Sequence, residues 1–398
     1  MEENVEEILF RVPPDEPAHL IRAALVCKTW RRILSDGGFR RRYCRFHRAP
    51  PLLGYFHHLG TCADGPQLVA AASVAAAFTT APASPGGGYA LDCRHGRVLI
   101  YTFSSAAATT PGLIVWDPIT GSQEPLSMPA DYHQTNTVGS FTGAVLCALH
   151  GHGCDHLDCH GGPFLVVFVA THAAVHATAT HTWATVYSSE TGAWSAAQAS
   201  SSTDNNGHLA TVRRRPSLLI GDALYFTLVH HFVIRILKYD LVGGGGLSVI
   251  NDTPQVSMFH DTAVAIEIDG QLGLVELSSR SFIYTWSQRQ ASAAANGGGV
   301  GGGGGGWVRN DDDAVELQAL IPPRRHTREL YPRHPCDSIR FVEGTNTVLV
   351  SINNSIAVGV FAIDLKSRQV RKVAETWDAG IIPYMSFYTL AACHQDDS

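Results

Sequence analysis

The sequence is poor in charge and has no long apolar run. Asp, Glu, Lys and Arg make up only 16% of the 398 residues, and 29 basic against 35 acidic residues leave a formal net charge of -6. This balance provides no field that would gather nucleic acid or anionic lipid, so neither partner is expected. The longest apolar stretches, Leu68–Phe78 and Phe164–Ala170, fall well short of the roughly 20 residues that cross a bilayer, so no membrane span is expected.

The chain also lacks a signal peptide pattern and a complete cysteine framework. Its start is acidic, with Glu2, Glu3, Glu6 and Glu7, and not basic with a following apolar stretch. The nine cysteines are an odd number and are scattered along the chain, which argues against a full set of disulfides and for reduced thiols. We therefore expect a cytoplasmic or nuclear protein.

Apolar residues, in contrast, are plentiful, and they follow a helical pattern at the start of the chain. They make up 45% of a chain longer than a single core usually supports, which favours one small module and one large domain. Helical three-and-four spacing first links Val5, Ile8, Leu9 and Val12. Pro13-Pro14 ends that helix, Asp15 is the expected cap of the next, and apolar helical spacing then continues to residue 46.

Basic residues are concentrated in this helical part. Nine of them lie between Arg22 and Arg48 against one acid, Asp36. The cluster is open to interpretation as a nucleic-acid patch, but no set of base-stacking aromatic residues accompanies it. We interpret it as a solvated helix face.

From Leu52 onward the pattern changes to short apolar runs rich in β-branched and aromatic residues and separated by Gly, Pro, Asn and Asp, which is typical of β-strands. An apolar strand that ends in a turn recurs at Leu113–Gly121, Ala184–Gly192, Ile236–Leu241, Ile283–Ser287 and Val360–Arg368. The Asp or Ser at each turn can accept hydrogen bonds from backbone N–H groups, so we expect these residues to be structural and not catalytic.

The numbers of residues that separate these units along the sequence predict a β-propeller. The two shorter intervals match the roughly 40 to 50 residues of a four-stranded blade. The two longer ones each contain an insertion, His/Cys-rich near 147–181 and Gly-rich near 291–306. With Ile381–Leu390 as a strand that closes the ring, we predict a small all-α module over residues 1–49, followed by an all-β propeller-like domain of about five to seven blades over residues 50–398.

The helical part carries four recognisable motifs. They are EILFRVPPDEP from Glu7, LVCKTWRRILSD from Leu25, FR from Phe39 and FHR from Phe46. Together they resemble the F-box of the large plant, especially grass, F-box family, whose members typically continue into a kelch-like or F-box-associated β-propeller.

The resemblance implies the substrate-recognition subunit of an SCF-type cullin-RING ubiquitin ligase. The F-box would bind the Skp adaptor, and through it the cullin and RING proteins, while the propeller binds a target protein that the sequence does not identify. Such a subunit does no chemistry and needs no cofactor. By motif position, the adaptor-binding set is Ile8, Leu9, Val12, Pro13, Leu25, Val26, Cys27 and Trp30.

One departure from the family pattern concerns the first residues. The family motif normally opens with Leu-Pro before the acidic pair, whereas Asn4 stands here where an apolar residue is usual. We expect weakened adaptor binding as a result.

A propeller scaffold that binds proteins without assembling a ligase stays open as the alternative function, because its recognition face would not depend on the F-box.

The segment from Cys147 to His160 contains three cysteines and four histidines, residue types that bind zinc when four of them converge. Their spacing matches no familiar zinc finger, so we interpret the segment as a His-rich blade loop without metal. Cys147, His150, Cys154 and Cys159 are the candidate ligands of the alternative interpretation, a zinc site.

No His-Glu-x-x-His, Gly-x-Ser-x-Gly or dinucleotide-binding motif is convincing, and no catalytic residue is assigned.

Overall fold

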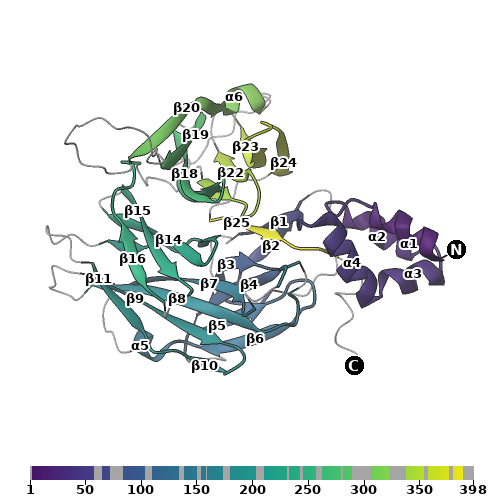
Figure 1. Ribbon diagram of the computed structural model, residues 1–398, viewed down its shortest axis with the longest axis horizontal. Helices are drawn as coiled ribbons and strands as arrows, with labels where there is room; N and C mark the ends of the chain where they lie inside the picture. Colours follow the sequence, from purple (N-terminus) through teal and green to yellow (C-terminus); the bar gives the residue numbers. More distant parts are fainter. Residues whose placement is uncertain are drawn as a thin grey trace, which may run out of the picture.

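The computed structural model places a small bundle of helices beside a ring of β-sheets (Figure 1). The structure describes residues 2–57, 65–71, 84–103, 110–133, 139–149, 154–157, 159–173, 180–202, 210–230, 233–242, 245–256, 262–278, 281–288, 306–321, 338–353, 357–375 and 380–388. Among the helices in these ranges, none is long and apolar enough to cross a membrane.

The helical module consists of α1 (Glu2–Phe10), α2 (Pro17–Ala24), α3 (Lys28–Leu34) and α4 (Gly37–His47). Pro17 lies in the first turn of α2, where its missing N–H group breaks no helical hydrogen bond. The carboxylate of Asp36 caps α4 by accepting a hydrogen bond from the Phe39 N–H at 2.7 Å. The cap of α2 is Glu16 and not the expected Asp15, and its side chain makes no capping hydrogen bond.

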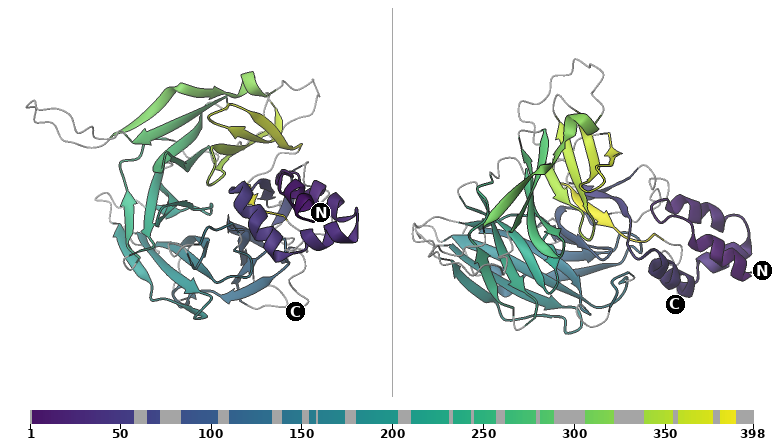
Figure 2. Two further views of the ribbon diagram at one scale, coloured as in Figure 1. Left: turned by 45° about the vertical axis from the view of Figure 1, so that its right-hand side comes forward. Right: turned by 45° about the horizontal axis from the view of Figure 1, so that its top comes forward.

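Six antiparallel sheets form the propeller, and their ring arrangement is visible in Figure 2. Blade 1 contains β3 (Gly88–Arg94), β4 (Arg97–Thr102), β5 (Gly112–Trp116) and β6 (Gln123–Ser127). Blade 2 contains β7 (Gly139–Cys147), β8 (Phe164–Ala173), β9 (Thr180–Ser188), β10 (Ala193–Trp194) and β11 (Gln198–Ser202). Blade 3 contains β12 (Thr211–Val212), β13 (Leu218–Ile220), β14 (Ala223–His230), β15 (Val233–Asp240) and β16 (Leu247–Ile250).

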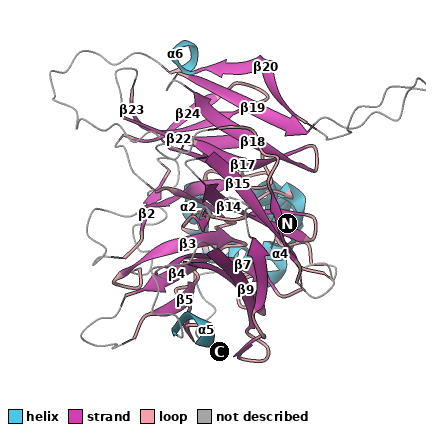
Figure 3. Ribbon diagram, turned by 90° about the vertical axis from the view of Figure 1, so that its left-hand side faces the viewer, coloured by secondary structure: helices cyan, strands magenta, loops and turns pink. Residues whose placement is uncertain are grey.

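The remaining blades follow the same order along the chain. Blade 4 contains β17 (Ala263–Ile268), β18 (Gln271–Ser278), β19 (Phe282–Gln288) and β20 (Trp307–Glu316). Blade 5 contains β21 (Ser338–Phe341), β22 (Thr347–Asn353), β23 (Val358–Asp364) and β24 (Val370–Ala374). Two short helices lie between strands, α5 (Ala130–His133) after β6 and α6 (Leu317–Leu320) after β20, so the ring consists almost wholly of strands (Figure 3).

The five units predicted from the sequence are the third strands of these five blades: β5, β9, β15, β19 and β23. Two of their turn residues, Asp117 and Asp364, accept hydrogen bonds from backbone N–H groups in the way that we expected. Oδ1 of Asp117 accepts hydrogen bonds from the N–H groups of Ile119 and Thr120, at 2.9 and 3.2 Å. Oδ1 of Asp364 does the same in blade 5, where the donors are the N–H groups of Lys366 and Ser367.

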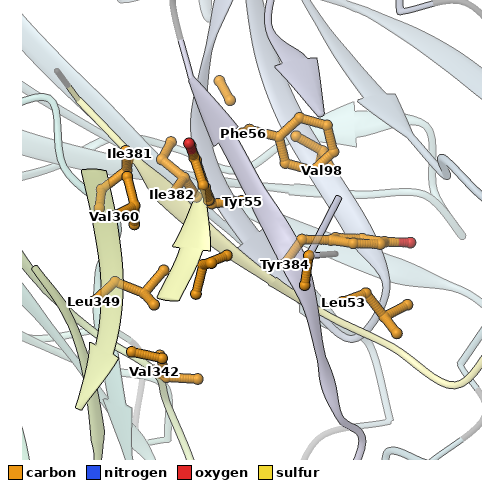
Figure 4. Close-up of a cluster of buried hydrophobic side chains, with 14 of the residues drawn as sticks. Leu53, Tyr55, Phe56, Val98, Val342, Leu349, Val360, Ile381, Ile382 and Tyr384 are labelled. Carbon is orange, nitrogen blue, oxygen red and sulfur yellow. The ribbon is translucent and has the colours of Figure 1, made fainter. Parts of the chain in front are cut away.

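The closing blade joins the two ends of the propeller. Its strands are β1 (Leu52–His57), β2 (Gln67–Ala70) and β25 (Ile382–Met385), and β1 pairs antiparallel with both others. The closing strand expected within Ile381–Leu390 is therefore present, although it ends at Met385. The fully buried rings of Tyr55, Phe56 and Tyr384 fill the core between this blade and its two neighbours (Figure 4). Six blades lie within the predicted range of five to seven.

The predicted insertion near 147–181 overlaps the strands of blade 2, because β8 begins at Phe164 and β9 at Thr180. The added residues are those between β7 and β8, and the long β7, β8 and β9 strands account for much of the remaining interval. The Gly-rich segment near 291–306 lies, apart from Gly306, outside the described residues. The predicted boundary at residue 49 falls between α4 and β1.

Candidate functional site

The helical module has a small apolar core of its own. Leu9, Leu20, Leu34, Phe39 and Tyr43 are buried in it, one or two from each helix. The Tyr43 hydroxyl donates a hydrogen bond to the carbonyl oxygen of Val12 at 2.7 Å, which ties α4 to the chain after α1. Burial raises the pKa of Tyr43, so its hydroxyl keeps the proton that this hydrogen bond uses.

Several large apolar side chains of the module face solvent. Ile8 is 60% exposed, Leu25 80% and Val26 64%. Large apolar side chains with this much exposure are candidate contact points for a partner. These three belong to the predicted adaptor-binding set, and Pro13 and Cys27 of that set are also exposed.

The other members of that set lie inside the module. Leu9 is buried, while Val12 and Trp30 are half-buried against the same core. The structure thus separates the eight predicted residues into five that reach solvent and three that hold the helices together. The basic cluster is exposed for the most part, but Arg40 is buried, unlike the solvated face that we expected.

The module packs against the propeller through two segments that come from elsewhere in the chain. Phe387, just after β25, is buried in the core of the module, where its ring meets Tyr43. Leu157, in the loop between β7 and β8, packs against the same core. The module is therefore seated on the ring by apolar contacts in addition to the short link between α4 and β1.

An arginine crosses the centre of the ring beneath this junction. Arg94 of β3 donates to Oδ2 of Asp92 at 2.7 Å and to both carboxylate oxygens of Glu343 at 2.7 Å each. It also donates to the carbonyl oxygen of Ser217 at 2.9 Å, and Asp92 accepts from the N–H of Val145 at 3.0 Å. Four blades supply these residues, so the network links blades that are not neighbours. Nothing in the sequence singled it out.

A cavity of about 310 Å³ separates the network from the module. Its walls come from both parts of the protein, namely the Arg48–Pro50 link, the β3–β4 turn at His95 and Gly96, the loop around Cys159, and the segment up to Phe387. The module therefore lies on the face of the ring that carries the β3–β4 turn.

The predicted metal candidates converge in the loop between β7 and β8. Cys147, Cys154 and Cys159 lie close together, and the fourth residue of the group is His156. His150, the fourth candidate from the sequence, lies outside the described residues.

The family comparison identifies the helical module. Residues 2–42 match the family model of the F-box domain. The chain carries an F-box domain followed by a six-bladed β-propeller. The match spans α1, α2, α3 and the first half of α4, and it includes Ile8, Leu25 and Val26 on the exposed apolar surface of the F-box.

Three solved structures are distantly similar to the chain. TolB from Acinetobacter baumannii is 13% identical with a TM-score of 0.40 over 88% of this chain and 72% of that one. The WD40 domain of SCAP from fission yeast is 10% identical with a TM-score of 0.32 over 72% and 54%. Aleuria aurantia lectin in complex with α-methyl-L-fucoside is 12% identical with a TM-score of 0.38 over 79% and 83%. Likenesses this distant carry no inference, and no curated protein matches the sequence.

Proposed function

We propose that this protein is the substrate-recognition subunit of an SCF-type cullin-RING ubiquitin ligase. The F-box binds the Skp adaptor, and the propeller binds the protein to be ubiquitinated. The subunit does no chemistry itself and acts in the cytosol or nucleus. The kelch-like class of the propeller and the plant origin, which the sequence motifs imply, belong to the same proposal.

The observation that carries this proposal is the exposed apolar surface of a domain that matches the F-box model. Ile8, Leu25 and Val26 together offer a partner three large aliphatic side chains. Burying each of them contributes roughly 1.5 to 3 kcal/mol of transfer free energy, before the costs of association are subtracted. Adaptor binding uses this surface, while Leu9 supports it from within.

The position of the F-box supports the far side of the ring as the place of target binding. The F-box covers the face with the β3–β4 turn, where it meets the cavity at Arg48. The strands β4 and β6 end at the opposite face, because neighbouring strands of blade 1 are antiparallel, and loops at one mouth of a propeller vary without change of fold. We place the target there, so that adaptor and target bind on opposite faces and do not compete.

The test is co-precipitation of purified full-length protein with the Skp adaptor and cullin. The double variant Leu25→Asp, Val26→Asp should lower adaptor affinity by at least about tenfold, because two charges replace apolar contacts. Val242→Asp is the matched control, since Val242 is 68% exposed but lies on the propeller. It should leave the affinity unchanged.

The same experiment separates the ligase from the scaffold. A wild-type chain that captures neither adaptor nor cullin, but still binds stable partners through the propeller, would overturn the ligase proposal and support a scaffold. Equal loss of adaptor in the F-box and propeller variants would show that the exposed apolar surface is not the contact.

A further inference from the structure

Four potential metal ligands meet where the β7–β8 loop leaves its blade. Cys147 is the last residue of β7, and Cys154, His156 and Cys159 follow in the loop. Their ligand atoms all lie within 4.8 Å of one another. Cys147 and Cys159 are buried, while Cys154 and His156 are half-buried, so the group is largely shielded from solvent.

Three of the six separations between these atoms match the edges of a zinc tetrahedron. With Zn–S bonds of about 2.3 Å and a Zn–N bond of about 2.0 to 2.1 Å, tetrahedral geometry places two sulfurs about 3.8 Å apart and a sulfur and a nitrogen about 3.5 Å apart. Cys154 Sγ lies 3.9 Å from Cys147 Sγ and 3.8 Å from Cys159 Sγ. Cys159 Sγ lies 3.6 Å from Nδ1 of His156.

A disulfide does not explain the group. It requires two sulfurs about 2.05 Å apart and would leave the third thiol unused. All three cysteines are free thiols in the structure. A set of three thiols and an imidazole around one point is the Cys₃His donor set of structural zinc sites.

Neighbouring residues hold the ligands in place. The ring of His156 stacks on that of His95, with centroids 4.3 Å apart and planes inclined by 8°. Nδ1 of His95 accepts a hydrogen bond from the N–H of Cys147 at 3.3 Å. Arg97 donates to the carbonyl oxygen of Cys159 and to that of Gly162, at 2.5 Å each. Support of this kind around the ligands is what orients them in a metal site.

We propose that Cys147, Cys154, His156 and Cys159 bind one zinc ion. Four protein ligands leave no coordination position open for water or substrate, so the site is structural. It stabilises the fold of the β7–β8 loop, because the binding energy of a structural zinc is largely folding energy. The zinc site does not depend on adaptor binding.

The zinc site bears directly on the F-box. Leu157 stands between two of the ligands in the sequence and packs against the F-box core. Oδ2 of Asp155 lies 3.5 Å from Nε of Arg45 in α4, although both side chains are exposed and such pairs contribute little. By ordering this loop, the zinc ion fixes how the F-box is seated on the propeller.

The first test is the metal content of the purified full-length protein by mass spectrometry. We expect about one zinc per chain in the wild type and in Cys93→Ser, which removes a cysteine outside the group. Cys154→Ser and Cys159→Ser should each lose most of the zinc. Wild-type protein without stoichiometric metal, or with any of the three cysteines joined in a disulfide, overturns the proposal.

Cobalt substitution of the wild type keeps the test independent of whether the variants fold. Tetrahedral Co²⁺ with three thiolates should show intense ligand-field bands and thiolate-to-cobalt charge transfer, whereas an octahedral spectrum overturns the assignment.

Hydrogen exchange with and without zinc tests the role of the zinc ion at the junction between the F-box and the propeller. Zinc removal should speed exchange in residues 154–162 and in α4, and unchanged exchange in α4 overturns that role.

Discussion

The rings of Tyr43 in α4 and Phe387 after β25 meet edge to face, with their centroids 6.2 Å apart. Tyr43 belongs to the F-box and Phe387 to the end of the propeller, and both are buried. This contact makes the F-box and the ring depend on each other for stability.

Phe387→Ala should therefore destabilise the F-box strongly. Removing a buried phenylalanine leaves a cavity and typically costs about 3 to 5 kcal/mol. The measure is the urea dependence of the circular dichroism of the helices. Phe46→Ala, at a phenylalanine that is 56% exposed, should cost about 1 kcal/mol or less. Equal losses in the two variants would contradict the anchoring role of Phe387.

Asn4→Leu should strengthen adaptor binding. Asn4 is exposed on α1, at a position where the F-box family usually has an apolar residue. A leucine that becomes buried at the contact should raise the affinity by roughly tenfold, as measured by calorimetry. Gln123→Leu, at an exposed position of β6, is the control for nonspecific hydrophobic binding of the adaptor. An unchanged affinity would show that position 4 lies outside the contact.

Asp92→Asn should alter the pH dependence of stability. Burial raises the pKa of Asp92 from 3.8 to about 6, although Arg94 opposes the shift. The folded state then binds the proton more tightly than the unfolded state. The stability contributed by that proton is full below about pH 4 and is lost as the pH rises through about 6, by up to about 3 kcal/mol.

Asp92→Asn has no carboxyl group to titrate at this position, so it lacks the loss of stability that the wild type shows as the pH rises. Its free energy of unfolding minus that of the wild type should therefore increase between about pH 4 and pH 7, as measured by urea unfolding at each pH. A difference that stays flat over this range would mean that Asp92 does not titrate in the folded protein.

Asp364→Asn should show the opposite slope. Burial alone would raise the pKa of Asp364, but the N–H groups of Ser367 and Lys366 hydrogen-bond to the carboxylate and hold the pKa below its ordinary value. The stability contributed by this carboxylate is present above the unfolded pKa and is lost as the pH falls through the lower folded pKa. The deficit of the variant, about 1 kcal/mol or less at neutral pH, should shrink on acidification. A constant deficit would contradict this.

Local patterns predicted the repeated part of the fold. The third strands were found because each combines an apolar run with a turn residue such as Asp117, both within ten residues of sequence. The closing strand was expected, but its partner β1 was not, because the two pair across more than 300 residues. The Arg94 network was missed for the same reason, since its partners Ser217 and Glu343 come from other blades.

The proposed zinc ligands could be predicted from the sequence only in part. The abundance of cysteine and histidine marked the segment, but neither spacing nor residue type distinguishes His156 from its neighbouring histidines. The β3–β4 turn distinguishes His156 from the other histidines, because it places the ring of His95 against that of His156. Gly96 allows that turn, with φ of 77° and no room for a Cβ beside His160.

Residues 382–387 have a consequence for synthesis of the chain. The F-box is translated before the propeller, whereas the strand that closes the ring and the phenylalanine that seats the F-box follow the other five blades in the sequence. A nascent chain that has not yet reached Phe387 therefore exposes both an open edge of the ring and an unsupported F-box core. Chaperones and proteases recognise exposed surfaces of this kind. Closure of the ring and seating of the F-box on the propeller therefore depend on the same short segment of the chain.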